Sequence, residues 1–262
     1  MPRPPVRAVV ASTLSAGALL TASACSAVGL EEAARAVRAP VSPASPAATA
    51  GAPTVPAADP TLTHAQARAA LIGEADLGEP WVPTEGFATW RDAMLKATTE
   101  SEACHRLLDS LYTEEVFGPD ARTRASVGLD DEWDEAQLRY RIVAHRPADV
   151  DRTLAWLGGM PGECGSFTAT AGGGPMEVRV REIELPEAGD ARQGLRVVLS
   201  AVSEYEDAPT LTLDVAAVRV GDDAIVVTTG GLGEVPADAT QAAVEVGAHR
   251  LAEVRKRGRA NI

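Results

Sequence analysis

An apolar run near the N-terminus constrains this chain most, because it decides in which compartment the rest of the chain must fold. The run covers residues 8–24, follows Arg3 and Arg7, and ends in small residues directly before Cys25. A positive start, an apolar middle and a small-residue exit are typical of an export signal. We therefore expect the first 24 residues to be a signal peptide that directs the chain out of the cytoplasm.

The residue that ends the apolar run makes the export prediction more specific. Because that residue is a cysteine, the segment resembles a bacterial lipobox, in which the cleaved chain begins at the cysteine and carries lipid there. Ala22 stands where lipoboxes usually have leucine. Secretion without lipid and a membrane-spanning anchor stay open, although a spanning helix needs about 20 apolar residues. We expect a lipid on Cys25, which would hold the protein at the outer face of the cell membrane.

The cysteine count agrees with this interpretation. The chain has three cysteines, and assigning Cys25 to the lipid leaves Cys104 and Cys164. An exported compartment permits disulfides, so we expect these two to pair; two separate buried thiols are the alternative. Neither a C-x-x-C motif nor a close His–Cys cluster is present. The sequence therefore predicts no metal site and no cofactor.

Composition divides the chain into regions and excludes one class of partner. Proline recurs among Ala, Ser and Thr after Cys25, so residues 25–61 are expected to be a disordered linker. Residues 62–255 then form one domain, and residues 256–262 are a basic tail. The formal net charge of −13 disfavours nucleic acid as a partner. All but two of the basic residues are arginines, a bias associated with GC-rich actinobacterial genomes.

Hydrophobic periodicity predicts the fold class. Leu138, Tyr140 and Ile142 alternate with arginines, which is typical of a strand with one buried face. Further strands follow, and helices are expected at about residues 63–72, 101–111, 147–157 and 239–254, the third ended by Gly158 and Gly159. Helices at both ends and hairpin-linked strands between them predict an α+β domain with an antiparallel sheet.

Several segments together resemble a known family. They are "EADLGEPW" (Glu74–Trp81), the helix that contains Cys104, the helix that ends before "CGSF" (Cys164–Phe167), and "VRVGDDAIVVTTGG" (Val218–Gly231). In order and motif they look like the extracellular sensor domain of PknH-like kinases and its free-standing lipoprotein relatives. The resemblance covers about residues 62–255. It implies a bent antiparallel sheet with helices packed on one side, and a cleft for an unknown ligand; it implies no catalytic activity.

The sequence offers few candidate site residues. Trp81 and Trp90 flank an irregular segment, where an aromatic side chain can line a cleft, although each alone is more typical of a core. The acidic run at residues 130–135 lacks EF-hand spacing and is expected to be a solvated loop. No nucleophile elbow, P-loop or zinc-protease motif is present, so no catalytic residue is assigned.

These observations predict a lipid-anchored envelope protein whose domain binds without transforming its ligand. The first hypothesis is a sensor-type module for an unknown small envelope ligand, and the second is an interaction module for another envelope protein. A hydrolase of envelope material is the third. A deep pocket with convergent polar groups favours the first, an exposed apolar patch the second, and a buried carboxylate pair or a nucleophile–base contact the third.

Overall fold

The structure, a computed structural model, describes residues 62–86, 88–203 and 208–260. The chain divides into two units, Met1–Thr54 and Val55–Ile262, and all described residues belong to the second. The predicted signal peptide, Cys25 and the predicted linker lie outside the described residues. Among the helices of the described part, none has the length and apolar character needed to cross a membrane.

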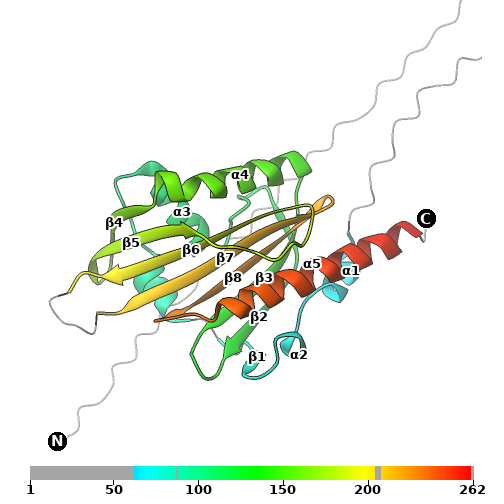
Figure 1. The fold of residues 1–262 in the computed structure, drawn as a ribbon, viewed down its shortest axis with the longest axis horizontal. Coiled ribbons are helices and arrows are strands. Elements are labelled where there is room, and N and C mark those ends of the chain that lie inside the picture. Colours follow the sequence, from blue (N-terminus) through cyan, green and yellow to red (C-terminus); the bar gives the residue numbers. More distant parts are fainter. Residues whose placement is uncertain (1–61, 87, 204–207, 261–262) are drawn as a thin grey trace, which may run out of the picture. The chain divides into compact units, whose positions relative to one another are not determined.

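Eight strands form one antiparallel sheet in the order β1-β2-β3-β8-β7-β6-β5-β4 (Figure 1). The two edge strands, β1 and β4, do not pair with each other, so the sheet is open. The strand bounds are β1 Trp81–Pro83, β2 Arg122–Asp131, β3 Gln137–Ala144, β4 Ser166–Ala171, β5 Gly174–Glu182, β6 Ala191–Ala201, β7 Thr210–Val220 and β8 Asp223–Leu232.

Two of the described helices begin where the sequence places capping residues. Thr63 and Gln66 form a reciprocal capping box at the first helix, and the hydroxyl of Ser101 accepts the backbone N–H of Cys104 at the start of α3. The helical elements are α1 His64–Ala69, α2 Glu74–Leu77, the short π-helix η1 Arg91–Leu95, α3 Glu102–Tyr112, α4 Pro147–Glu163 and α5 Ala237–Ala260.

Helices cover the two faces of the sheet over different strands (Figure 1). Val215 and Ala217 of β7 pack in one core cluster with η1, α3 and α4; we call this side the α4 face. Ala216 and Val218 belong to a second cluster with α1 and α5, on the α5 face. Successive residues of a strand point to opposite faces, so β7 is buried on both. The α4 face is covered mainly over β4–β7, and the α5 face over β2, β3, β8 and β7.

The predicted α+β class with an antiparallel sheet is confirmed. The predicted packing of helices on one side holds within each half of the sheet, that is, within the β4–β7 half and within the half made of β2, β3 and β8. The two halves carry their helices on opposite faces, which periodicity does not indicate. As a result, neither of the two longest described helices, α4 and α5, covers the α4 face of β2 and β3. The segment that links β1 to β2 crosses this part of the sheet instead, and the candidate site lies there.

Two predicted helix ends are wrong. Helix α4 does not stop at Gly158 and Gly159 but continues through them to Glu163. Leu157 and Met160 are both buried against the α4 face, and this burial outweighs the conformational cost of glycine in a helix. Helix α5 extends to Ala260, so residues 256–260 of the predicted tail form its last turns. Basic side chains are favourable at that position because they oppose the helix dipole.

Candidate functional site

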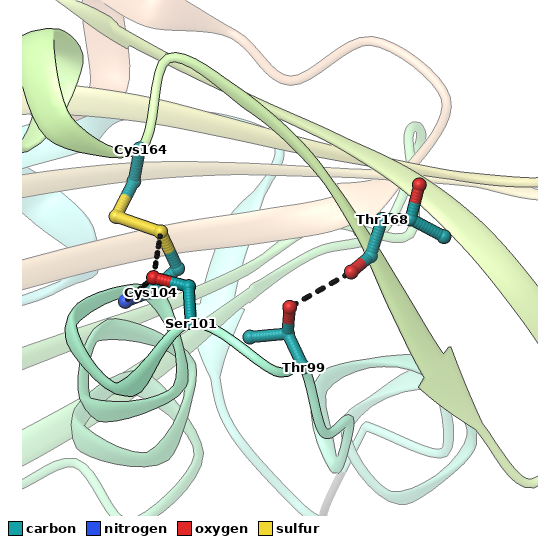
Figure 2. Close-up of a disulfide and its surroundings, with 5 residues drawn as sticks. All are labelled: Thr99, Ser101, Cys104, Cys164 and Thr168. Carbon is teal, nitrogen blue, oxygen red and sulfur yellow. Dashed lines mark hydrogen bonds between the residues drawn. A yellow bond between two sulfur atoms is a disulfide. The ribbon is translucent and has the colours of Figure 1, made fainter.

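The predicted disulfide is present and joins α3 to the chain that leads into β4. Cys104 and Cys164 are bonded, with their Cα atoms 5.6 Å apart, and both are buried in the core of the α4 face (Figure 2). The segment before α3 also runs along the edge of the sheet: the hydroxyl of Thr99 donates to the carbonyl of Thr168 at 2.8 Å. The bond therefore fixes α3 and the chain before it against β4.

The two tryptophans predicted to line a cleft do not lie together. Trp81 is in β1 and packs in the core cluster of the α5 face, whereas Trp90 directly precedes η1 and packs in the cluster of the α4 face. Both are largely buried. A side chain at Gly230 would place its Cβ 2.8 Å from the Trp90 ring, so this glycine in β8 provides the space for the indole.

Of the two, Trp90 borders a cavity of about 320 Å³, which we call the Trp90 cavity. Its indole Nε1–H is buried and has no hydrogen-bond partner among the described residues. Trp90 itself is only 7% exposed. A buried donor without an acceptor costs about 1–3 kcal/mol. The other lining residues are Gly86, Ala88, Thr89, Asp130, Asp131, Glu135, Ala136, Gln137 and Leu232.

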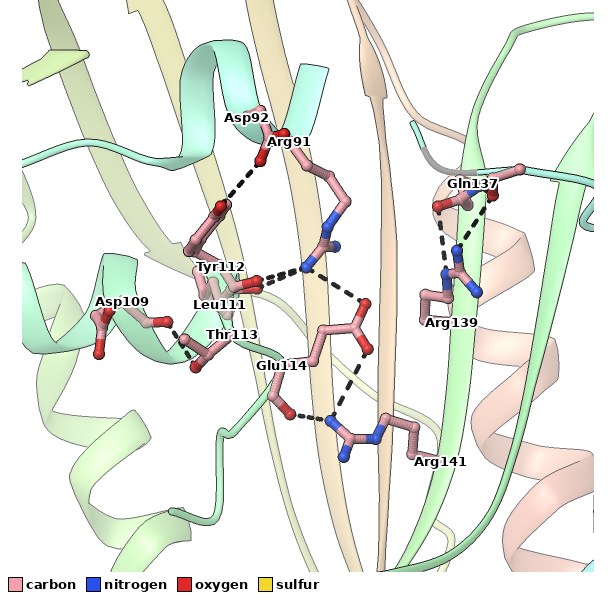
Figure 3. A network of polar contacts seen from close by, with 11 residues as sticks. Arg91, Asp92, Asp109, Leu111, Tyr112, Thr113, Glu114, Gln137, Arg139 and Arg141 are labelled. Carbon is pink, nitrogen blue, oxygen red and sulfur yellow. Dashed lines mark hydrogen bonds and ion pairs between the residues drawn. The ribbon is translucent and has the colours of Figure 1, made fainter. Parts of the chain in front are cut away.

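A hydrogen-bonded group forms the floor of this cavity. The Gln137 side chain donates to Asp130 Oδ1 at 2.8 Å and to the carbonyl of Gly86 at 3.4 Å, and Thr84 donates to the same Asp130 oxygen at 2.7 Å. Arg139 Nε donates to Gln137 Oε1 at 3.2 Å (Figure 3). These bonds fix the 84–86 segment onto β2 and β3, so the cavity has a rigid polar floor.

An ion-pair cluster lies farther along β3, outside the lining of the Trp90 cavity. Arg91 Nη2 lies 3.3 Å from Glu114 Oε1 and donates to the carbonyl of Tyr112 at 2.8 Å, at the end of α3 (Figure 3). Arg141 of β3 lies 3.9 Å from the second Glu114 oxygen and also donates to the backbone carbonyl of Glu114. Glu114 therefore joins η1, α3 and β3.

Sequence reasoning found part of the floor and of the ion-pair cluster and missed the rest. It identified Arg139 and Arg141 as the polar face of an alternating strand, and Gln137 continues the same parity by one more step. Asp130 and Glu114 carried no such signal. Asp130 belongs to the acidic run expected to be a loop, but the structure places it in β2, paired with Gln137. Asp131 is the last residue of β2, and residues 132–136 form the hairpin turn.

The exposed large apolar side chains of the described part gather at one end of the sheet. Trp133 in the β2–β3 hairpin is 73% exposed, Val202 after β6 is 62% exposed, and Leu232 at the end of β8 is 49% exposed. Strand register places all three at the end opposite the β7–β8 turn. Within the described ranges, no group of three or more His, Cys, Asp or Glu side chains is arranged to hold a metal ion.

Comparison with known proteins gives a structural likeness and no sequence match. No protein-family model matches the chain, and no curated protein matches it. Among solved structures, the chain is similar to the extracellular domain of PknH from Mycobacterium tuberculosis, with 13% sequence identity and a TM-score of 0.45. The match covers 76% of this chain and 100% of that domain.

Proposed function

We propose that this protein is lipid-anchored at the outer face of the cell membrane through Cys25, and that its domain binds a small envelope ligand without transforming it. The signal anatomy supports the anchor, and the Cys104–Cys164 disulfide suits an oxidising compartment. The Trp90 cavity supports the binding role. In this proposal the domain is a sensor-type module.

The observation that carries the binding role is the unpartnered Nε1–H of Trp90, a residue that borders the cavity. Asp130 and Gln137 bond to each other and to neighbouring groups, so they hold the shape of the floor, and the buried indole N–H has no acceptor among the described residues. An acceptor on a ligand would satisfy that donor, and the indole ring would supply apolar contact. Polar groups that are held in fixed positions around a recess are typical of small-molecule sites.

A matched pair of tryptophan variants tests the placement of the site. A panel of envelope phospholipids, glycans and peptidoglycan fragments is screened for a rise in melting temperature, since a ligand that binds the native state stabilises it. Trp90→Phe removes the N–H and should weaken the shift given by any hit. Trp81→Phe makes the same change in the core of the α5 face and should leave the shift intact.

The result also separates binding from catalysis. A shift that both variants lose equally would place the site elsewhere, and a panel without any hit would count against a small ligand. Turnover of a panel compound, abolished by one side-chain substitution, would overturn the non-enzymatic role in favour of a hydrolase.

A second candidate function is an interaction module for another envelope protein. It rests on the exposure of Trp133, Val202 and Leu232 at one end of the sheet, since exposed apolar side chains often mark interaction sites. Crosslinking in native membranes, followed by mass spectrometry, should capture one specific partner. Trp133→Ala should abolish that capture while the thermal shift of a small ligand persists, which distinguishes this role from the first.

The lipid anchor has its own test. Cys25→Ala removes the only thiol available to an N-terminal lipid and should move the protein from the membrane fraction to the soluble fraction. If the variant stays in the membrane after a high-salt wash, the protein is held there by something other than lipid on Cys25.

A further inference from the structure

The end of the domain at which the described chain begins also contains the last turns of the C-terminal helix, α5. His64 Nδ1 of α1 lies 3.1 Å from the backbone carbonyl of Arg124 in β2. A Cβ at Gly258 of α5 would lie 2.7 Å from the Gln66 side chain. The start of α1, the start of β2 and the last turns of α5 therefore meet. This end of the β2–β3 hairpin is opposite to the one that carries the Trp90 cavity.

A cavity of about 530 Å³ opens at this end, with basic residues from β2, the β3–α4 connection and α5 around it. Two of its arginines are already engaged: Arg255 pairs with Asp222 and Asp223, and Arg146 pairs with Asp149. The lining comprises Arg122, Arg124, His145, Arg146 and Arg255 with Ala144 and Pro147, and also the carboxylates of Asp120, Asp222 and Asp223.

Other cations at this end lack such partners within the described part of the chain. Arg122 is exposed, with no ion pair from its side chain, and the buried Nε of Arg124 has no hydrogen-bond partner. Arg68 on α1 and Lys256 on α5 are exposed and likewise have no ion pair there. We call Arg68, Arg122, Arg124 and Lys256 together the basic end. Arg124 lies close enough to Asp223 for the two charges to interact, whereas Arg68, Arg122 and Lys256 are exposed cations without an ion pair in the described part of a chain whose formal net charge is −13.

We propose that the basic end docks against anionic phospholipid headgroups beside the lipid anchor. The inference rests on the anchoring proposed above: Leu62, the first described residue, lies 37 positions after Cys25, so the tether enters the domain at this end. A tether raises the local concentration of membrane at the basic end, and each cation near an anionic surface contributes roughly fivefold in affinity. The acidic remainder of the chain is repelled, which turns the Trp90 cavity away from the bilayer.

Vesicle binding by the unlipidated protein tests the docking surface independently of the anchor. The chain from residue 25 with Cys25→Ser retains the whole of Val55–Ile262, the unit to which every described element belongs. It is sedimented with vesicles of phosphatidylglycerol and phosphatidylcholine, and with vesicles of phosphatidylcholine alone. We expect binding to the anionic vesicles only, lost on raising the salt concentration.

Two triple variants with the same change in net charge locate the surface. Arg68→Gln/Arg122→Gln/Lys256→Gln changes exposed residues of the basic end and should weaken binding by on the order of 100-fold. The control, Arg179→Gln/Arg181→Gln/Arg192→Gln, neutralises three arginines of β5 and β6 and should change binding little. Arg124 is left intact because its partly buried side chain contributes to packing.

The outcomes separate this inference from the proposed function. Equal binding to both vesicle types, or equal loss in the two triple variants, would overturn the docking surface. Binding to soluble polyphosphate without binding to vesicles would also overturn it, in favour of a soluble polyanion. None of these results depends on lipidation of Cys25 or on occupancy of the Trp90 cavity, so each proposal can fail alone.

Discussion

The two faces of the sheet hold their helices in different ways. On the α4 face, large side chains such as Leu154, Leu157 and Met160 pack against the strands, and a disulfide ties α3 to the chain after α4. On the α5 face, the buried positions of α5 are mostly small, and the helix approaches closely enough for Gly247 to contact the Tyr140 ring. A covalent tie thus accompanies the face packed by large helix side chains, and close backbone approach accompanies the face packed by small ones.

The largest expected effect is loss of the disulfide, which tests whether the α4 face depends on its covalent tie. Cys104→Ala/Cys164→Ala opens a loop of 60 residues and should lower the free energy of unfolding by about 4 kcal/mol. Urea titration of the variant, and of the wild type with and without reductant, measures it. A loss below about 1 kcal/mol would mean that packing alone holds α3 and α4.

A pair of glycine substitutions tests the close approach on the α5 face. An alanine Cβ at Gly247 would lie 2.5 Å from the buried Tyr140 ring, so Gly247→Ala should destabilise the fold by about 1–3 kcal/mol. Gly159→Ala in α4 meets no atom within 4 Å and should stabilise by up to about 1 kcal/mol through helix propensity. Thermal unfolding of both variants should therefore show shifts of opposite sign.

The smallest expected effect concerns the hydroxyl of Tyr140, which is buried without a hydrogen-bond partner among the described residues. Tyr140→Phe should raise the free energy of unfolding by about 1 kcal/mol near neutral pH, because it removes an unsatisfied polar group. The outcome that would contradict this is destabilisation at neutral pH, since it would reveal a partner for the hydroxyl.

The same substitution has a signature at alkaline pH. Burial raises the pKa of Tyr140 well above that of an exposed tyrosine, although the charge of Arg250 partly opposes the shift. Above roughly pH 10 the phenol ionises in the unfolded chain while it stays protonated in the folded one, so stability falls as the pH rises. Urea midpoints measured between about pH 9 and 11 should decline less steeply for Tyr140→Phe than for the wild type.

Local patterns predicted the elements well because helix caps and strand alternation are properties of neighbouring residues. The alternation of Leu138, Tyr140 and Ile142 identified a buried strand face, and Thr63 marked the first helix. Gly158 and Gly159 led to a wrong prediction of where α4 ends, because their weak helix propensity is overridden by burial farther along the same helix.

The candidate site was less predictable because its contacts join distant segments. Arg141 lies 27 residues after its partner Glu114, and no spacing rule connects the two. Trp81 and Trp90 are close in sequence, yet they lie in opposite cores, because the chain leaves the edge strand β1 between them and crosses onto the α4 face. The disulfide was predictable for a different reason: cysteine counting in an exported chain leaves one pair.

The segment before α3 also covers part of the edge strand β4. Thr98 exchanges two backbone hydrogen bonds with Thr170, at 2.8 and 2.9 Å, and the hydroxyl of Thr99 donates to the backbone carbonyl of Thr168. These contacts use edge groups of β4 that would otherwise be available to a strand from another molecule. Because the disulfide holds α3, it also keeps Thr98 and Thr99 in place against β4. Reduction would therefore expose a template for intermolecular strand addition, and self-association should begin at β4 before the rest of the domain unfolds.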